Sequence, residues 1–168
     1  MGKKTEKVTA VALLAALALV YALIPVPEWM QEGVSLRTAL THHFWHVNAA
    51  HLAANGVALL AFAWVLPRWY RLLPAAYAAA SLSMLFAAKP VIGLSNILFA
   101  MSGLCAPTVK DYWKRKETWT FVAIMLIMLC VPRLSAATHI ASFIAGFVLG
   151  TINKTIRRTA NDCRRAGG

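Results

Sequence analysis

Hydrophobic positions along this chain gather into six long runs that short polar segments separate. The runs cover residues 8–24, 46–66, 72–88, 92–107, 119–131 and 134–152. An untilted helix needs roughly 20 apolar residues to cross about 30 Å of hydrocarbon, and the third and fifth runs have almost no polar face. The pattern therefore predicts six membrane-spanning helices, with the shorter ones packed inside protein or in thinned bilayer, rather than an amphipathic bundle in water.

Composition supports a membrane protein, because 60% of the 168 residues are hydrophobic, only 14% are charged, and the mean hydropathy is +0.61. We find no internal repeat and no soluble domain, so residues 1–168 are expected to form one membrane domain. A basic tail from about residue 154 is expected to be mobile. The first run could resemble a signal peptide, but five further runs follow it, and we interpret it as an uncleaved helix.

The basic residues decide what the net charge of +11 means. With a cytoplasmic N-terminus, six spans place Arg37, Lys89 and Arg133 outside and the remaining Lys and Arg side chains inside. This asymmetry predicts cytoplasmic termini and a multi-pass protein of the cell (inner) membrane. We therefore attribute the charge to topology and to attraction for anionic lipid, and we expect no nucleic-acid partner.

Four polar residues lie inside the apolar runs, where polar groups are costly and usually face a bundle interior. His51 and Asn55 are spaced i, i+4 and share one helix face. Gly93 discourages helix, so we expect a helix to begin at Ser95, below the outer surface, and His139 lies near the start of the sixth run. Counting about 1.5 Å per residue from the inner ends puts Ser95 and His139 at one depth, bracketed by His51 and Asn55.

This layer predicts acyl-transfer chemistry, because an imidazole that takes the proton of a serine makes the serine a nucleophile. The sixth run carries Ser142, Gly146 and Gly150 at four-residue spacing, which suits close contact between two membrane helices. We expect a Ser-His dyad rather than a triad, since all six acidic residues are expected in loops or tails: Glu6, Glu28, Glu32, Asp111, Glu117 and Asp162.

At these positions the chain resembles the rhomboid family of intramembrane serine proteases. The family's second-helix pattern of three His and one Asn is met by His42, His46, His51 and Asn55. The segment "GLSNILFAMSG" is similar to the family's Gly-x-Ser nucleophile segment, and "THIASFIAG" is similar to its sixth-helix histidine segment.

The resemblance implies a compact six-helix bundle in which Ser95 is the nucleophile and His139 the general base. His51, Asn55 and the backbone N–H of Ser95 would form the oxyanion hole. It also implies transmembrane protein substrates, an active site that opens to the extracytoplasmic side, and no metal or other cofactor.

Several positions depart from the family pattern. Asn96 replaces a common second glycine, Phe99 stands where a tyrosine often stacks on the histidine, and Ser142 replaces a glycine. No adjacent Trp-Arg pair occurs in the first outer loop, where Trp29 and Arg37 are eight residues apart.

Two other classes of function stay open at this point. One is a catalytically silent rhomboid-like protein that binds transmembrane helices. The other is a histidine-based metal carrier or metalloprotease, although the chain has no HExxH motif. For a protease, we expect the substrate to reach Ser95 between the fifth and second helices, past Phe121, Met125 and Met128.

Overall fold

The computed structural model describes residues 3–30, 32–66, 68–87, 91–109, 111–114, 116, 118–119, 122–123, 126–127 and 136–166. Over these residues the protein is all-helical, as the sequence predicted, and contains no strand. The α-helices are α1 (Lys3–Leu23), α2 (Leu36–Thr41), α3 (Ala49–Val65), α4 (Leu73–Met84), α5 (Ser95–Thr108) and α7 (Ala136–Ala166). Short 3₁₀ helices are η1 (Glu28–Met30), η2 (His42–Phe44), η3 (Trp69–Leu72) and η4 (Tyr112–Lys114).

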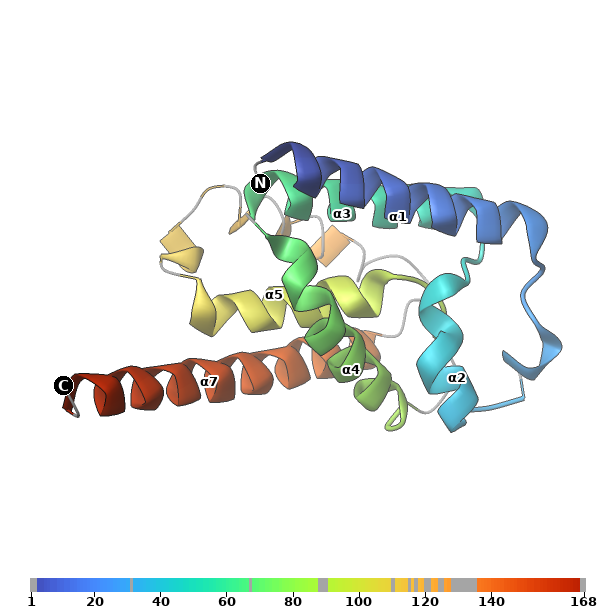
Figure 1. Cartoon of the computed structure of the whole chain (residues 1–168). Helices are drawn as coiled ribbons and strands as arrows, with labels where there is room; N and C mark the ends of the chain where they lie inside the picture. Colours follow the sequence, from blue (N-terminus) through green and yellow to red (C-terminus); the bar gives the residue numbers. More distant parts are fainter. Residues whose placement is uncertain are drawn as a thin grey trace.

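The helices form two pairs, and α4 packs against the second of them. α1 packs along α3, α5 packs along α7, and α4 crosses to contact both α5 and α7 (Figure 1). The N-terminus and the C-terminal end of α7 lie at the same end of the molecule (Figure 1). The inner helix is α5, in which every residue from Ser95 to Cys105 is buried.

Glycines allow α5 and α7 to approach closely. A Cβ on Gly146 would overlap the backbone carbonyl of Ala100, and one on Gly103 would overlap the carbonyl of Phe143. The predicted small-residue stripe is therefore confirmed at Gly146. Its first member, Ser142, instead contacts α4, where its hydroxyl lies 2.6 Å from that of Ser83.

Side-chain caps mark two helix starts near the site. The backbone N–H of His51 donates to Oδ1 of Asn48 at 2.8 Å at the start of α3, and Ser35 accepts from the N–H of Thr38 at 3.1 Å at the start of α2. Each cap satisfies one of the N–H groups that a helix leaves unpaired in its first turn.

The basic segment expected as a mobile tail is helical, because α7 continues without a break to Ala166. No proline or glycine interrupts this segment, and most of its residues are compatible with helix. The helix therefore extends beyond the apolar window that ends at Ile156.

By length and composition, two of the described helices are able to cross a membrane, namely Thr5–Leu23 within α1 and Ala136–Ile156 within α7. Leu36–Phe44 and Ala49–Trp64 together pass the same test as one span bent by 80°. With 12 and 14 residues, α4 and α5 are too short for that test. Six spans, with both termini in the cytoplasm, therefore stay a prediction.

One acidic residue was misplaced by the sequence analysis. Glu6 lies in the first turn of α1 rather than in a loop, and it is buried. Its carboxylate accepts the backbone N–H of Arg68 at 2.6 Å, and the indole N–H of Trp69 donates to its carbonyl at 3.2 Å. Glu6 thereby fixes the chain reversal after α3, where Arg68 has a positive φ of 60°.

Candidate functional site

Ser95 and His139 are hydrogen-bonded to each other. Nε2 of His139 lies 2.8 Å from Oγ of Ser95, and both side chains are buried. Ser95 is the first residue of α5 and His139 lies in the first turn of α7. The two helices run in the same direction, so these neighbouring ends bring the two residues together (Figure 1).

The segment before Ser95 turns sharply at Gly93. This residue has a φ of +124°, a conformation that side chains with a Cβ rarely adopt. Its N–H donates to the carbonyl of His42 in η2 at 2.9 Å, so η2 fixes the approach to α5. Helix then begins at Ser95, as the sequence predicted.

His51 and Asn55 face this turn from α3. A Cβ placed on Gly93 would lie 2.9 Å from Nε2 of His51 and 3.2 Å from Nδ2 of Asn55. The missing side chain at position 93 therefore leaves room for both groups. The four predicted site residues come together from three helices, as the depth count required.

Within the described part of the chain, Nε2 of His51 and both side-chain polar atoms of Asn55 are buried without a hydrogen bond. A buried polar group left unpaired costs about 1–3 kcal/mol, and such groups in a native protein call for an explanation. Donors held unpaired beside a serine are suited to bind an oxygen that develops negative charge.

Asn96, the residue beside Ser95, binds the ring of His42. Nδ1 of His42 lies 2.9 Å from the carbonyl of Ala39, so this nitrogen carries the proton. Its Nε2 is therefore an acceptor, and Nδ2 of Asn96 donates to it at 3.1 Å. Two contacts thus tie η2 to the start of α5, one through the His42 ring and one through its backbone carbonyl.

We predict that Asn96→Leu lowers the free energy of unfolding by about 1–3 kcal/mol, because Nε2 of His42 loses its buried donor. His42→Phe should have a similar effect. In the double variant the two losses should not add, because both remove the same hydrogen bond. Thermal unfolding of detergent-purified protein measures all three variants, and full additivity would show that Asn96 and His42 act independently.

The structure shows the contacts made at two of the places where the chain departs from the family pattern. The ring of Phe99 lies 4.7 Å from that of His139 at an interplanar angle of 47°, so an aromatic contact with the histidine is kept although the rings are tilted. Trp29 and Arg37, separated in sequence, meet in space. The guanidinium carbon of Arg37 lies 4.0 Å from the centre of the Trp29 ring, a cation–π contact.

Other sequence expectations concern metals, carboxylates and substrate access. Among the residues that the structure describes, no group of three His, Cys, Asp or Glu side chains is arranged to hold a metal ion. Of the carboxylates, Glu6 binds Arg68 and Asp111 pairs with Lys114. Most of the fifth run, including Phe121, Met125 and Met128, lies outside the described residues.

Sequence reasoning missed three contributors to the site. Gly93 was identified as a helix breaker and as part of the Gly-x-Ser segment, but the space that its lack of a side chain makes for His51 and Asn55 was not predicted. Asn96 was noted only as a departure from the family's second glycine, yet it binds His42. Gly103, in α5, was not assigned a role, although it meets the backbone of α7. The sequence did contain a signal for that contact, because α5 and α7 each have a glycine about two turns after Ser95 or His139, and small residues allow membrane helices to pack closely.

Comparison with known proteins identifies the family of this chain. The family model described as Rhomboid domain matches residues 33–155, which include all four predicted site residues. No curated protein and no solved structure matches the chain. Because the family model covers well over half of its length, the chain belongs to the rhomboid family, whose members are embedded in membranes and are in general serine proteases.

Proposed function

We propose that this chain is an intramembrane serine endopeptidase that hydrolyses peptide bonds in or near transmembrane segments of other membrane proteins. The observation that carries the proposal is the buried hydrogen bond of 2.8 Å between Ser95 and His139. Family membership supports it independently. A serine that only packs between helices does not require an imidazole at its hydroxyl.

In this proposal Ser95 attacks the carbonyl carbon of the scissile bond while Nε2 of His139 takes the hydroxyl proton. His139 then gives that proton to the leaving amine, which releases one product and leaves an acyl group on Ser95. Water, deprotonated by the same imidazole, attacks the acyl group, and the proton returns to Ser95 as the second product leaves. The dyad is thus restored.

The negative oxygen of each tetrahedral intermediate would be held by His51, Asn55 and the N–H of Ser95. The proposed role of the His51 and Asn55 side chains is supported by Nε2 of His51 and both polar atoms of Asn55, which are buried without a hydrogen-bond partner in the described part of the chain. The N–H of Ser95 belongs to the first turn of α5 and has no acceptor within its own helix. The positive end of the α5 dipole favours charge at the same point.

The proposal includes six spans, cytoplasmic termini and a site that opens to the extracytoplasmic side of the inner membrane. It is supported by the basic residues at the inner ends of the predicted runs. Ser95 is fully buried, so a substrate reaches it only when part of the surrounding wall moves. We retain the gap between the fifth and second helices as the predicted route.

Labelling of detergent-purified protein with a fluorophosphonate, with and without a metal chelator, tests the proposal. Labelling of wild type that is lost in Ser95→Ala and unchanged by chelator is the expected result. A folded wild type that does not label would favour the silent binder of transmembrane helices. Substrate cleavage that chelator abolishes would favour a metal-dependent protein.

A further inference from the structure

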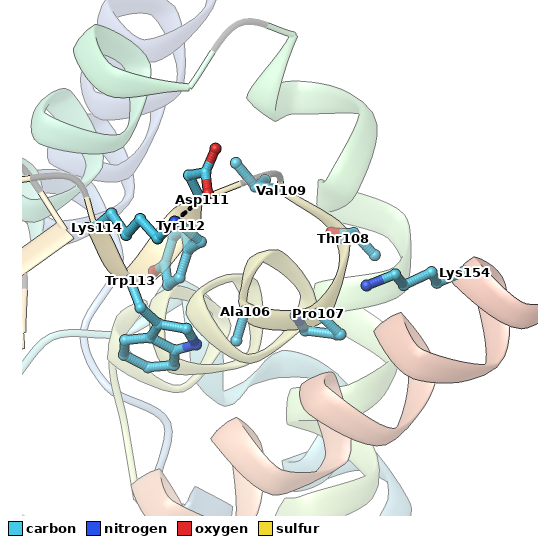
Figure 2. Close-up of a pocket in the computed structure, with 9 residues that line it drawn as sticks. All are labelled: Ala106, Pro107, Thr108, Val109, Asp111, Tyr112, Trp113, Lys114 and Lys154. Carbon is cyan, nitrogen blue, oxygen red and sulfur yellow. Dashed lines mark ion pairs between the residues drawn. The ribbon is translucent and has the colours of Figure 1, made fainter.

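A pocket lies at the opposite end of α5 and α7 from Ser95. It has a volume of about 490 Å³ and is bounded by the C-terminal end of α5, by η4 and by α7 (Figure 2). Volumes of this size are typical of sites for small ligands. The proposed protease chemistry assigns no role to this pocket.

Close packing of α5 and α7 builds the pocket. A Cβ on Gly150 would lie 2.7 Å from the carbonyl of Leu104 and 2.8 Å from Cγ of Pro107, so the helices nearly touch there. Lys154 is four residues further along α7 and therefore lies on the same face, one turn on. Its side chain extends from α7 toward Thr108 and Pro107 (Figure 2).

The pocket carries an excess of positive charge. Lys114 is paired with Asp111 at 3.2 Å, whereas Lys154 has no ion pair with any carboxylate that the structure describes. Tyr112 adds no negative charge, because burial raises the pKa of its hydroxyl to about 12. An unpaired ammonium group over a concave surface attracts an anion.

The surroundings of the pocket indicate a membrane boundary. The apolar window of α7 ends at Ile156, two residues after Lys154. On the other wall, Trp113 is partly exposed, and its carbonyl accepts the indole N–H of Trp119 at 2.8 Å. Tryptophan is enriched at the level of lipid headgroups, so we expect Lys154 at the depth of lipid phosphates.

We propose that this pocket binds the phosphate of an anionic glycerophospholipid, with Lys154 as the main charged contact and Trp113 beside the headgroup. Basic pockets between membrane helices are suited to anionic headgroups. A free phosphate ion would use the same ammonium group, but it would gain nothing from the exposed apolar side chains two residues to either side of Lys154 in α7, Ile152 and Ile156. This binding is independent of the proposed protease activity.

Thermal unfolding of the full chain in detergent, titrated with phosphatidylglycerol, phosphatidylcholine or inorganic phosphate, tests the proposal. We expect only phosphatidylglycerol to raise the unfolding midpoint. Lys154→Gln should weaken the apparent affinity about tenfold, and Lys154→Arg should restore most of it. The matched control is Arg71→Gln, which removes an exposed positive charge from η3, outside the pocket, and should leave the affinity unchanged.

Three outcomes would overturn the proposal. If Lys154→Gln and Arg71→Gln weakened the apparent affinity for phosphatidylglycerol equally, lipid binding would depend on net charge alone. A midpoint shift with inorganic phosphate as large as that with lipid would mean an ion site rather than a lipid site. Equal shifts with phosphatidylcholine would mean that the anionic charge is not recognised. Because Lys154 is exposed, Lys154→Gln should fold like wild type, and its midpoint without lipid checks this.

Discussion

Ser95→Ala and His139→Ala should each abolish cleavage of a model transmembrane substrate, with rates reduced by roughly 10⁴-fold or more. Residues that act as one nucleophilic unit lose nearly all of their contribution when either is removed. Both variants should still fold, because the side chains become smaller and the glycine contacts between α5 and α7 are unchanged. Cleavage by protein reconstituted in vesicles, together with the thermal unfolding midpoint, measures the two effects separately.

The matched control is Ser102→Ala, also in α5. Ser102 is buried like Ser95, but its hydroxyl lies 2.9 Å from that of Tyr112 rather than near an imidazole. This variant should keep its cleavage activity. Asn55→Ala and His51→Ala should each lose about 2.7–4 kcal/mol of transition-state stabilisation, a smaller effect, because the remaining oxyanion donors still act. Wild-type rates in Ser95→Ala or His139→Ala would rule out the dyad.

Much of the fold followed from the apolar pattern. The glycine at position 93 indicated that helix begins at Ser95, and α5 starts at that residue. The depth count then predicted that Ser95 and His139 would lie together. Both were counted from the inner end of a predicted helix, and both came out at the same depth. Length and position were sufficient here, since a membrane helix has a fixed rise per residue.

The pattern of apolar positions did not predict the hydrogen bonds between distant parts of the chain. Nothing in the sequence near Glu6 indicated that its carboxylate would bind a backbone N–H more than sixty residues away. The contact between Asn96 and His42 likewise depends on a ring orientation that the Ala39 carbonyl sets. Such contacts depend on distances between helices, which periodicity along one helix does not contain.

The same limit applies to the Trp29 and Arg37 pair. Their separation in sequence suggested that the family's outer-loop contact was missing, yet the chain turns at Gly33, where φ is +140°. The start of α2 then brings Arg37 back over the Trp29 ring. A pattern defined by adjacent residues cannot detect a contact that a turn makes between distant ones.

The spacing of α5 and α7 gives the second large prediction, which concerns Gly146. This residue is seven positions after His139, about two turns along α7, and it meets the backbone of Ala100. A Cβ at position 146 has no flexible side chain to displace, so the two helices must move apart. Since the Ser95–His139 bond spans the same pair of helices, it should be lost or lengthened.

Helix propensity and packing predict opposite signs for Gly146→Ala. Alanine favours an isolated helix over glycine by about 0.8–1.0 kcal/mol, whereas overpacking a close contact costs about 1–3 kcal/mol or more. We expect packing to dominate, because the obstacle is main chain. The thermal unfolding midpoint should fall. Cleavage should fall by about 10²-fold or more, since a misplacement of about 1 Å can cost that much.

Gly56→Ala in α3 is the matched control for this prediction. A Cβ on Gly56 meets only the end of the Leu14 side chain, at 3.2 Å, and that side chain is able to rotate away. Propensity should therefore dominate at Gly56, with an unchanged or higher unfolding midpoint and normal cleavage. If Gly146→Ala instead raised the midpoint as Gly56→Ala is expected to, the backbone contact between α5 and α7 could not be what holds Ser95 against His139.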